Sequence, residues 1–381
     1  NVFNLLFIIL LILVLVAEIF MPQLIFLIAP GFYKDPEKLK LAVELSRITF
    51  PFLFFISLAS FFGAILNSYN KFAAAAAAPI ILNVILIGSL FFSQWLDISD
   101  VVVLSYAVSF AGFLQLLVLF FFVRKNFKPI LKIKIKIDEK IKFFFNKLLP
   151  SIFSSGVTQV NILVGTIIAS FQAGAVSYLY YADRVYQINL AIAGIAVSTV
   201  MLPELSKYVK INNKDRVADL QNRSLELCLF LSLPAATALI LASEEIITSL
   251  FGYGSFDNES VMNTSIALTF FAFGVPAFSI LKILSNLFFA RNDTKTPFYL
   301  SVVSVILNVV ISVSLFSRLG FVIIPIATSI SSWINVFMHY YFIKKGDLHI
   351  FDSKFIYKFP RMILSVVVMG IVLYLLLSFF S

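Results

Sequence analysis

The sequence predicts an all-α integral membrane protein with about eleven membrane-spanning helices. Hydrophobic residues make up 60% of its 381 residues and charged residues only 13%, and the mean hydropathy is +0.99. A soluble fold of this length could not bury so much apolar surface, so the excess must face lipid. The apolar runs reach about 18 residues or more, which is the length of a spanning helix and too long for the alternating strands of a membrane barrel.

Hydrophilic breaks divide these apolar runs into separate spans. We expect spans at 2–28, 43–67, 73–94, 101–123, 148–171, 177–203, 224–242, 260–289, 298–316, 321–343 and 361–380. Prolines at positions 51, 234, 276 and 325 predict kinks, because proline cannot donate the backbone hydrogen bond that a continuous helix requires.

The rest of the composition narrows the class of protein. The single cysteine, Cys228, excludes a disulfide framework, and His339 and His349 are too far apart for a typical metal site. No nucleotide-binding glycine loop occurs in the sequence, so we expect neither a metal nor a cofactor. Residue 1 is Asn and the first apolar run is too long for a signal peptide, so we interpret the chain as a fragment.

The basic residues predict the orientation of the spans. If the first span starts in the cytoplasm, 22 of the 29 Lys and Arg residues fall in or beside cytoplasmic loops and five on the opposite side. The positive-inside rule favours this orientation. The net charge of +9 therefore indicates membrane topology and contact between the basic cytoplasmic loops and anionic lipids, and it does not indicate nucleic-acid binding.

An internal repeat predicts two related blocks of helices. Pro51 precedes Asn83 by the same interval that separates Pro276 from Asn308, and a polar turn lies midway in both stretches. Transporters are often built from duplicated bundles with the binding site between them. The basic loop 124–147 separates four predicted spans from the seven that follow.

Three charged residues lie within apolar segments: Asp183, Arg184 and Lys282. A charge at the bilayer centre costs at least about 2.5–3.5 kcal/mol, so such residues usually face a cavity or a partner. Arg184 either binds a phosphate through two parallel hydrogen bonds or forms a structural ion pair. Asp183 either binds a coupling cation, orients Arg184, or forms a hydrogen bond to a neighbouring helix. Lys282 either meets an anionic head group or extends towards the inner interface. Together they favour a pathway for an anionic substrate.

Other polar residues carry weaker predictions. Gln159 and Asn161 either line a cavity or join helices through hydrogen bonds. Glu204 either supports ion coupling or is an interfacial carboxylate. The cluster of Tyr178, Tyr180 and Tyr181 is most simply an aromatic belt at the membrane surface.

An ordered set of short motifs resembles the MurJ (MviN) family of lipid II flippases, from about residue 20 to about residue 340. The motifs are Ala29-Pro30-Gly31-Phe32, Arg47-Ile48-Thr49-Phe50-Pro51, Gly63-Ala64-Ile65-Leu66-Asn67, Tyr180-Tyr181-Ala182-Asp183-Arg184, Leu202-Pro203-Glu204-Leu205-Ser206 and Arg291-Asn292-Asp293-Thr294-Lys295-Thr296-Pro297.

The resemblance implies the fold of the multidrug/oligosaccharidyl-lipid/polysaccharide exporters, in which two six-helix lobes surround a central cavity and further helices follow. This chain then looks like the third to thirteenth helices. Residues 1–123 would be the four remaining helices of the N-terminal lobe and 124–147 the cytoplasmic loop between the lobes. Residues 148–343 would be the six-helix C-terminal lobe, and 344–381 a basic cytoplasmic loop with one additional helix.

The resemblance also implies a function. The expected activity is not enzymatic: it is the movement of lipid II, the undecaprenyl-diphosphate-linked peptidoglycan precursor, from the inner to the outer leaflet of the bacterial cytoplasmic membrane by alternating access. Arg184 would be a diphosphate-binding residue by its motif, and the cell-wall synthesis machinery is a further expected partner. The alternatives are a flippase for another polyprenyl-linked glycan, a drug/cation antiporter of the same fold, and an integral-membrane enzyme acting on polyprenyl phosphate.

Overall fold

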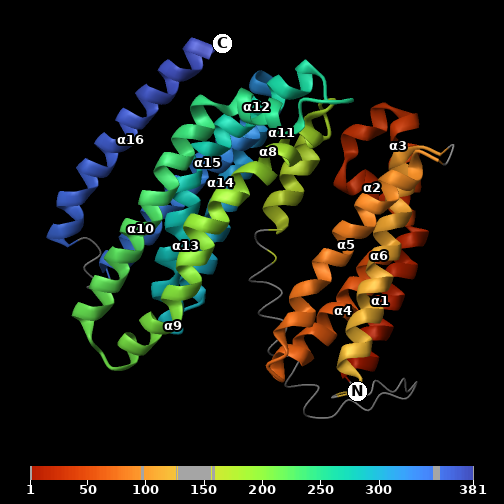
Figure 1. Cartoon of the computed structure of the whole chain (residues 1–381), viewed down its shortest axis with the longest axis horizontal. Helices are drawn as coiled ribbons and strands as arrows, with labels where there is room; N and C mark the ends of the chain where they lie inside the picture. The colour runs from red at the N-terminus through yellow and green to blue at the C-terminus, as the bar shows by residue number, and fades with distance from the viewer. Residues whose placement is uncertain are drawn as a thin grey trace. The chain divides into compact units, whose positions relative to one another are not determined.

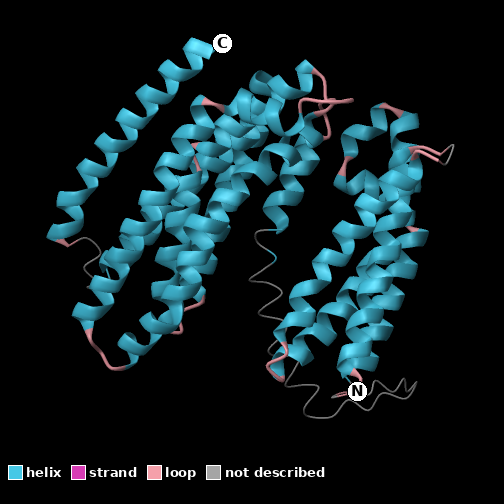
Figure 2. Cartoon of the chain, viewed as in Figure 1, coloured by secondary structure: helices cyan, strands magenta, loops and turns pink. Residues whose placement is uncertain are grey.

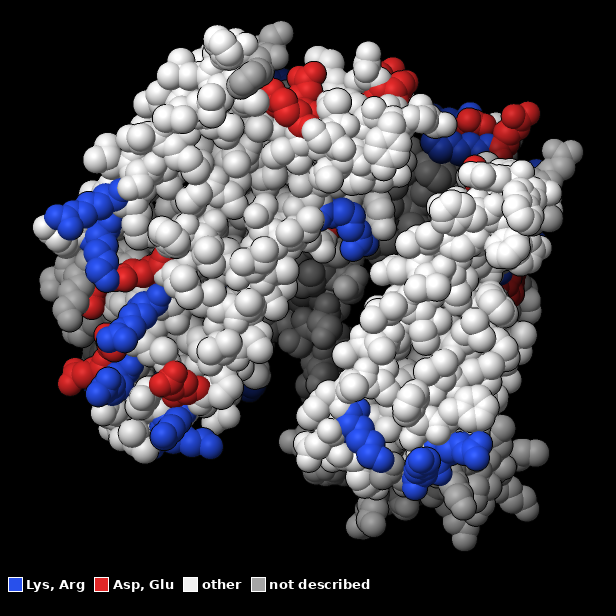
Figure 3. Space-filling view, viewed as in Figure 1, with Lys and Arg blue, Asp and Glu red and all other residues white. Residues whose placement is uncertain are grey.

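The structure, a computed structural model, describes residues 2–95, 98–125, 127, 156, 159–345 and 352–380. All regular secondary structure in these ranges is helical, as Figures 1 and 2 show, which confirms the predicted fold class. Contacts divide the chain into two compact units, Asn1–Ile152 (unit 1) and Phe153–Ser381 (unit 2). Figure 3 shows broad uncharged surfaces on each unit, with most of the visible charges near helix ends, as expected for helices that face lipid.

Unit 1 is a bundle of long apolar helices. Its helices are α1 (Val2–Ile19), α2 (Met21–Ile28), the 3-10 turn η1 (Pro30–Lys34), α3 (Pro36–Thr49), α4 (Pro51–Ser68), α5 (Phe72–Ser93) and α6 (Asp100–Val123). Phenylalanines dominate its core: the Phe3 ring stacks on the Phe62 ring at 5.5 Å between centroids, and Leu66 and Leu119 are buried beside them. Aromatic rings at this spacing add to the gain from burial alone.

A glycine sets the distance between α4 and α6. A Cβ atom on Gly112 would lie 2.6 Å from the Phe52 ring and 3.3 Å from Phe55 Cβ. The absence of a side chain at position 112 therefore lets the Phe52 ring pack directly against the α6 backbone. Small residues at such crossings allow membrane helices to approach closely.

Unit 2 contains the remaining helices. They are the helix Gln159–Ala169, α8 (Ala175–Leu190), the π-helical turn η2 (Ala191–Ala196), α9 (Val197–Lys210), α10 (Lys214–Leu241), α11 (Ser243–Phe251), α12 (Asn258–Ala272), α13 (Val275–Ala290), α14 (Lys295–Leu319), the 3-10 turn η3 (Gly320–Val322), α15 (Ile323–Lys345) and α16 (Ser353–Phe380). Two buried apolar clusters hold them together, one around Leu268 and one around Leu287.

The predicted spans of unit 2 differ in whether their helices bend, continue or turn back. A short break separates α12 from α13, and the two helices are bent by 40° there, just before Pro276, whereas Pro234 lies inside the continuous helix α10. Helices α8 and α9 run on as a single stretch through η2, where a Cβ atom on Gly194 would lie 3.1 Å from Ser279 Cα of α13. Helices α14 and α15 form an antiparallel hairpin, because Ser304 pairs with Ser331 and Asn308 pairs with Thr328.

The internal repeat corresponds to equivalent helix pairs. Pro51 stands at the start of α4 and Pro276 at the start of α13. Each helix ends at a turn with an asparagine of positive φ, Asn70 at 58° and Asn292 at 61°, and a second long helix follows. Asparagine tolerates this left-handed conformation better than most residues, so the two blocks share their turn chemistry as well as their prolines.

Eight helices or helical stretches in the described ranges are long and apolar enough to cross a membrane, and nine if the bent pair α12–α13 is one span. One of the eight, Lys295–Lys345, contains both helices of the α14–α15 hairpin. The total of eleven stays a prediction, because much of the predicted span 148–171 lies outside the described residues. The loop 124–147 also lies mostly outside them, so the predicted lobe boundaries stay predictions.

Candidate functional site

The two adjacent charges of α8 point in different directions. The turn before α8 places Gly174 at φ 73°, and the helix then runs from Ala175 through both charged residues. Neighbouring helical residues are about 100° apart around the axis. Asp183 is half-buried, whereas Arg184 is exposed. The two side chains therefore lie on different faces of one helix, as their adjacency in the sequence predicts.

Asp183 faces a cavity of about 190 Å3 within unit 2. Asn161 and Thr166 of the helix Gln159–Ala169 and Thr328 of α15 line the same cavity. The carboxylate accepts a hydrogen bond from the Gln187 side chain, four residues further along α8. A partner from its own helix thus holds Asp183 in place, and its cavity is lined by further polar groups.

Arg184 lies over an aromatic ring. Its guanidinium carbon is 4.7 Å from the centre of the Tyr180 ring, one helical turn earlier. Within the described ranges, no carboxylate forms an ion pair with Arg184. A ring face attracts a cation without neutralising it. The guanidinium therefore keeps its positive charge and its hydrogen-bond donors for a ligand, and the predicted alternative of a structural ion pair receives no support among these residues.

Lys282 does not lie beside Arg184. The Ser198 hydroxyl of α9 donates to the Lys282 carbonyl at 3.3 Å, and the Asn286 amide donates to the Ser198 carbonyl at 2.7 Å. Lys282 is therefore level with Ser198, which follows Arg184 by fourteen residues in the same helical stretch. At 1.5 Å per residue the two levels are about 21 Å apart. The exposed Lys282 and Arg184 side chains are therefore too far apart to bind one diphosphate at the same time.

The remaining predicted residues occupy separate places. Gln159 is exposed at the start of its helix and is not among the residues that line the cavity of Asp183. Glu204 is exposed on α9 and accepts a hydrogen bond from the Tyr208 hydroxyl at 3.3 Å. The structure therefore brings Asn161 and Asp183 together, with Arg184 on the adjoining face, and leaves Gln159, Glu204 and Lys282 apart from them.

The partners of the two charges were not predicted from the sequence. Tyr180 precedes Arg184 by four residues, and Gln187 follows Asp183 by four, which is the spacing that brings helical side chains together. This spacing of four residues could have predicted both contacts from the sequence. The predicted tyrosine cluster has different contacts at each ring. The Tyr181 ring packs against the rings of Phe251 and Phe256, at 4.9 and 5.2 Å between centroids, whereas the Tyr180 ring contacts the Arg184 guanidinium.

Comparison with known proteins gives one consistent family. The family model described as lipid II flippase MurJ matches residues 1–381. A protein of Rickettsia prowazekii named "Probable lipid II flippase MurJ" is 40% identical over 355 residues, which are 92% of this chain and 69% of that protein. A protein of the same name from Rhizobium meliloti is 38% identical over 379 residues, which are 98% of this chain and 71% of that protein.

Solved structures agree with this assignment. A structure described as "Lipid II flippase MurJ, inward closed conformation" matches with a TM-score of 0.81 and 26% identity, covering 99% of this chain and 82% of that one. An inward-facing multidrug resistance MATE family transporter matches with a TM-score of 0.75 at 15% identity, covering 91% of this chain and 80% of that one, which shows a shared fold. The chain belongs to the lipid II flippase MurJ family.

Proposed function

We propose that this chain is a multi-pass transporter of the bacterial inner membrane that moves lipid II from the inner to the outer leaflet. Membership of the MurJ family over the whole chain carries the proposal. The exposed Arg184 guanidinium, which has no carboxylate partner in the described ranges, supports it. A diphosphate is a dianion that must cross a region of low dielectric constant, where an unpaired guanidinium offers charge and bidentate hydrogen bonds.

In the proposed mechanism Arg184 binds the diphosphate directly and Asp183 does not compete for it. The Asp183 carboxylate accepts its hydrogen bond from Gln187 and lies on a different face of α8, so it does not neutralise Arg184. The Tyr180 ring limits the positions that the Arg184 side chain can adopt. These contacts hold the Arg184 guanidinium in a position to bind the head group. Asn161 and Asp183 face a small cavity, and we propose that their oxygen atoms bind a coupling cation there.

Lys282 provides a second position for the anion in this proposal. The separation of about 21 Å along the helices is a large part of the roughly 30 Å hydrocarbon core. By the predicted topology Lys282 lies near the inner end of its span and Arg184 nearer the outer end. We propose that the diphosphate meets Lys282 first and Arg184 later, while alternating access opens the pathway to one side and then the other.

Leaflet exchange in proteoliposomes tests the proposed function. The purified full-length protein is reconstituted with fluorescent lipid II, and the accessible fraction is followed over time beside protein-free vesicles. We expect lipid II to exchange between the leaflets and to be recovered with its mass unchanged, and we expect little exchange of fluorescent phosphatidylcholine. An altered product mass would identify an enzyme, and faster exchange of another polyprenyl-linked glycan would identify a different substrate. Either result would overturn the proposal.

A further inference from the structure

A cleft within unit 2 lies between α10 and α16, away from the residues discussed above. Its volume is about 610 Å3. Of the described residues that line it, three are basic, Arg223, Lys358 and Arg361, and one, Glu226, is acidic. The remaining lining is mostly apolar and includes Leu227, Phe230, Pro234, Met362, Val366 and Met369. We call this cavity the α10–α16 cleft.

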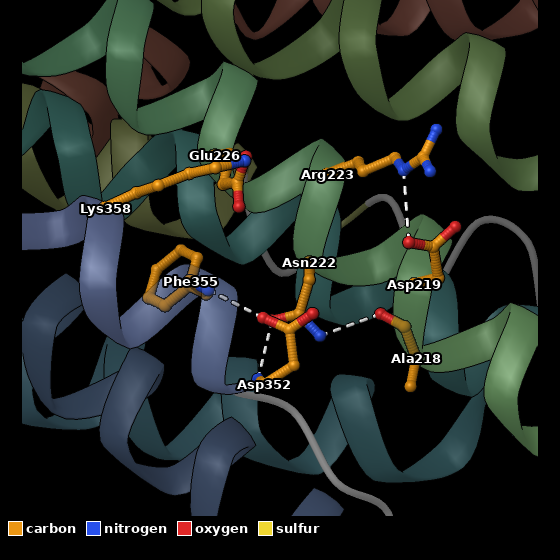
Figure 4. A network of polar contacts seen from close by, with 8 residues as sticks. All are labelled: Ala218, Asp219, Asn222, Arg223, Glu226, Asp352, Phe355 and Lys358. Atoms are coloured by element: carbon orange, nitrogen blue, oxygen red, sulfur yellow. Dashed lines mark hydrogen bonds and ion pairs between the residues drawn. The ribbon is translucent and has the colours of Figure 1, made fainter.

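A network of polar contacts fixes the two walls of the cleft against each other (Figure 4). The Asn222 side-chain oxygen accepts a hydrogen bond from the Asp352 backbone at 3.3 Å, and the Asp352 carboxylate accepts one from the Phe355 backbone at 2.7 Å. Lys358 of α16 and Glu226 of α10 form an ion pair at 2.7 Å. The start of α16 is therefore held on α10 by specific bonds, and the cleft is a formed feature of unit 2.

The ion pair leaves two arginines at the basic end of the cleft. Arg223 uses its Nε to contact Asp219 at 3.1 Å, and Figure 4 shows its terminal nitrogens directed away from that carboxylate. The Arg361 guanidinium lies over the Tyr357 ring, 4.0 Å from its centre, and one of its terminal nitrogens donates to the Tyr357 hydroxyl, which leaves its remaining N–H groups for a ligand. Exposed ion pairs such as Arg223–Asp219 are weak, so Arg223 can rearrange around a stronger anion. Both guanidinium groups thus have donors to offer a phosphate.

The apolar part of the cleft continues from this basic end along α16. Lys358 and Met369 are eleven residues apart, which is about 16 Å of helix. By the predicted topology α10 and α16 both start on the cytoplasmic side, so the arginines lie at the level of inner-leaflet head groups and the apolar residues at the level of acyl chains. A positive end beside a long apolar wall matches one class of molecule.

We propose that the α10–α16 cleft binds one anionic phospholipid of the inner leaflet. Its phosphate lies at Arg223 and Arg361, and one acyl chain packs along Phe230, Val366 and Met369. The bound lipid completes the packing of α16 on α10, because the polar contacts between these helices among the described residues lie at the start of α16. This site is separate from the proposed transport pathway and does not depend on it.

Native mass spectrometry of the full-length protein tests the proposal. The detergent-purified protein is titrated with dioleoylphosphatidylglycerol and, in parallel, with dioleoylphosphatidylcholine. We expect one phosphatidylglycerol to bind at least about tenfold more tightly than phosphatidylcholine, and R223Q/R361Q to remove most of this preference, because two charge-assisted contacts are lost. Val366→Trp, which fills the apolar part and keeps every charge, should also weaken the first bound phosphatidylglycerol.

K207Q/K210Q is the matched control. Lys207 and Lys210 are exposed bases in the last turn of α9, on the same predicted side of the membrane, and they do not line the cleft. The control should leave the preference unchanged while removing the same charge. Equal affinity for the two lipids would overturn the proposal, as would equal losses in the two double variants. Helical circular dichroism and elution volume confirm that each variant is folded.

Discussion

At the scale of single residues, the Tyr180 ring beneath Arg184 should matter for transport. We expect Tyr180→Leu to slow lipid II exchange about two- to fivefold, since a cation–ring contact at an exposed site contributes about 0.5–1 kcal/mol. Tyr180→Phe keeps the ring and should retain nearly the full rate. Exchange rates in proteoliposomes at matched protein levels measure both. Equal losses in the two variants would mean that the hydroxyl, rather than the ring face, is the important group.

A second residue-scale prediction concerns the turn between α13 and α14. Burial alone raises the pKa of Asp293, but hydrogen bonds from Thr296 and Lys295 outweigh it and hold the pKa below its usual value of 3.8. The carboxylate accepts from both backbone N–H groups, at 3.0 and 3.1 Å. Asp293→Ala should therefore lower the free energy of unfolding by about 1 kcal/mol, as loss of a helix cap does.

The sign of the pH dependence follows from the lowered pKa. Stabilisation by the charged carboxylate is fully present above the usual pKa and is lost as the pH falls through the lowered one. The difference in thermal midpoint between the protein and Asp293→Asn, which keeps an oxygen acceptor but no charge, should be constant near neutral pH and shrink below about pH 4. A difference that grows on acidification would contradict this account.

The charged residues of the candidate site could be predicted from the sequence, but which of them lie close together could not. Asp183 and Arg184 could be identified because charge inside an apolar span is conspicuous, and their adjacency already indicated divergent directions. The predicted topology already places Arg184 and Lys282 nearer opposite ends of their spans. Which residue of α9 lies beside Lys282 could not be predicted, because the contacts of Ser198 with α13 set that register. Hydropathy places residues along each span and carries no information on contacts between spans.

At the scale of helices, the crossing of α4 and α6 gives a test with an internal control. Gly112→Ala should destabilise the protein by about 1–3 kcal/mol, because the new Cβ atom would overlap the Phe52 ring. Gly88→Ala in α5 meets no atom within 4 Å and should be neutral or slightly stabilising, since alanine favours a helix. Thermal unfolding in detergent compares the two. A Gly112→Ala variant as stable as Gly88→Ala would show that α4 and α6 are not packed this closely.

Helix shapes show where sequence patterns stop being informative. Pro276 predicted the bend before α13, because its missing N–H coincides with a break in the helix. The π-helical turn η2 was not predicted, since Ala191–Ala196 is an ordinary apolar helical sequence and only the close approach of Gly194 to Ser279 marks the position. Pro234 lies in an unbroken helix, so proline alone does not decide whether a helix breaks.

At the scale of the whole molecule, the predicted topology can be tested with single cysteines, because the native Cys228 is buried. Ile211 lies in the turn between α9 and α10, and Tyr253 lies just after α11. Both side chains are exposed, at 62% and 72% respectively. We expect Tyr253→Cys to react with a membrane-impermeant maleimide in intact spheroplasts and Ile211→Cys to react only after permeabilisation. The reverse pattern would invert the predicted orientation.

The central claim is that the positive charge of Arg184 carries the diphosphate across the membrane. The most direct measurement is the rate of lipid II exchange by full-length protein in proteoliposomes, comparing Arg184→Ala with Arg318→Ala. Arg318 is an exposed arginine in the last turn of α14 and serves as the matched control. We predict that Arg184→Ala abolishes exchange at normal protein levels and that Arg318→Ala retains it. Full exchange by Arg184→Ala would contradict the claim.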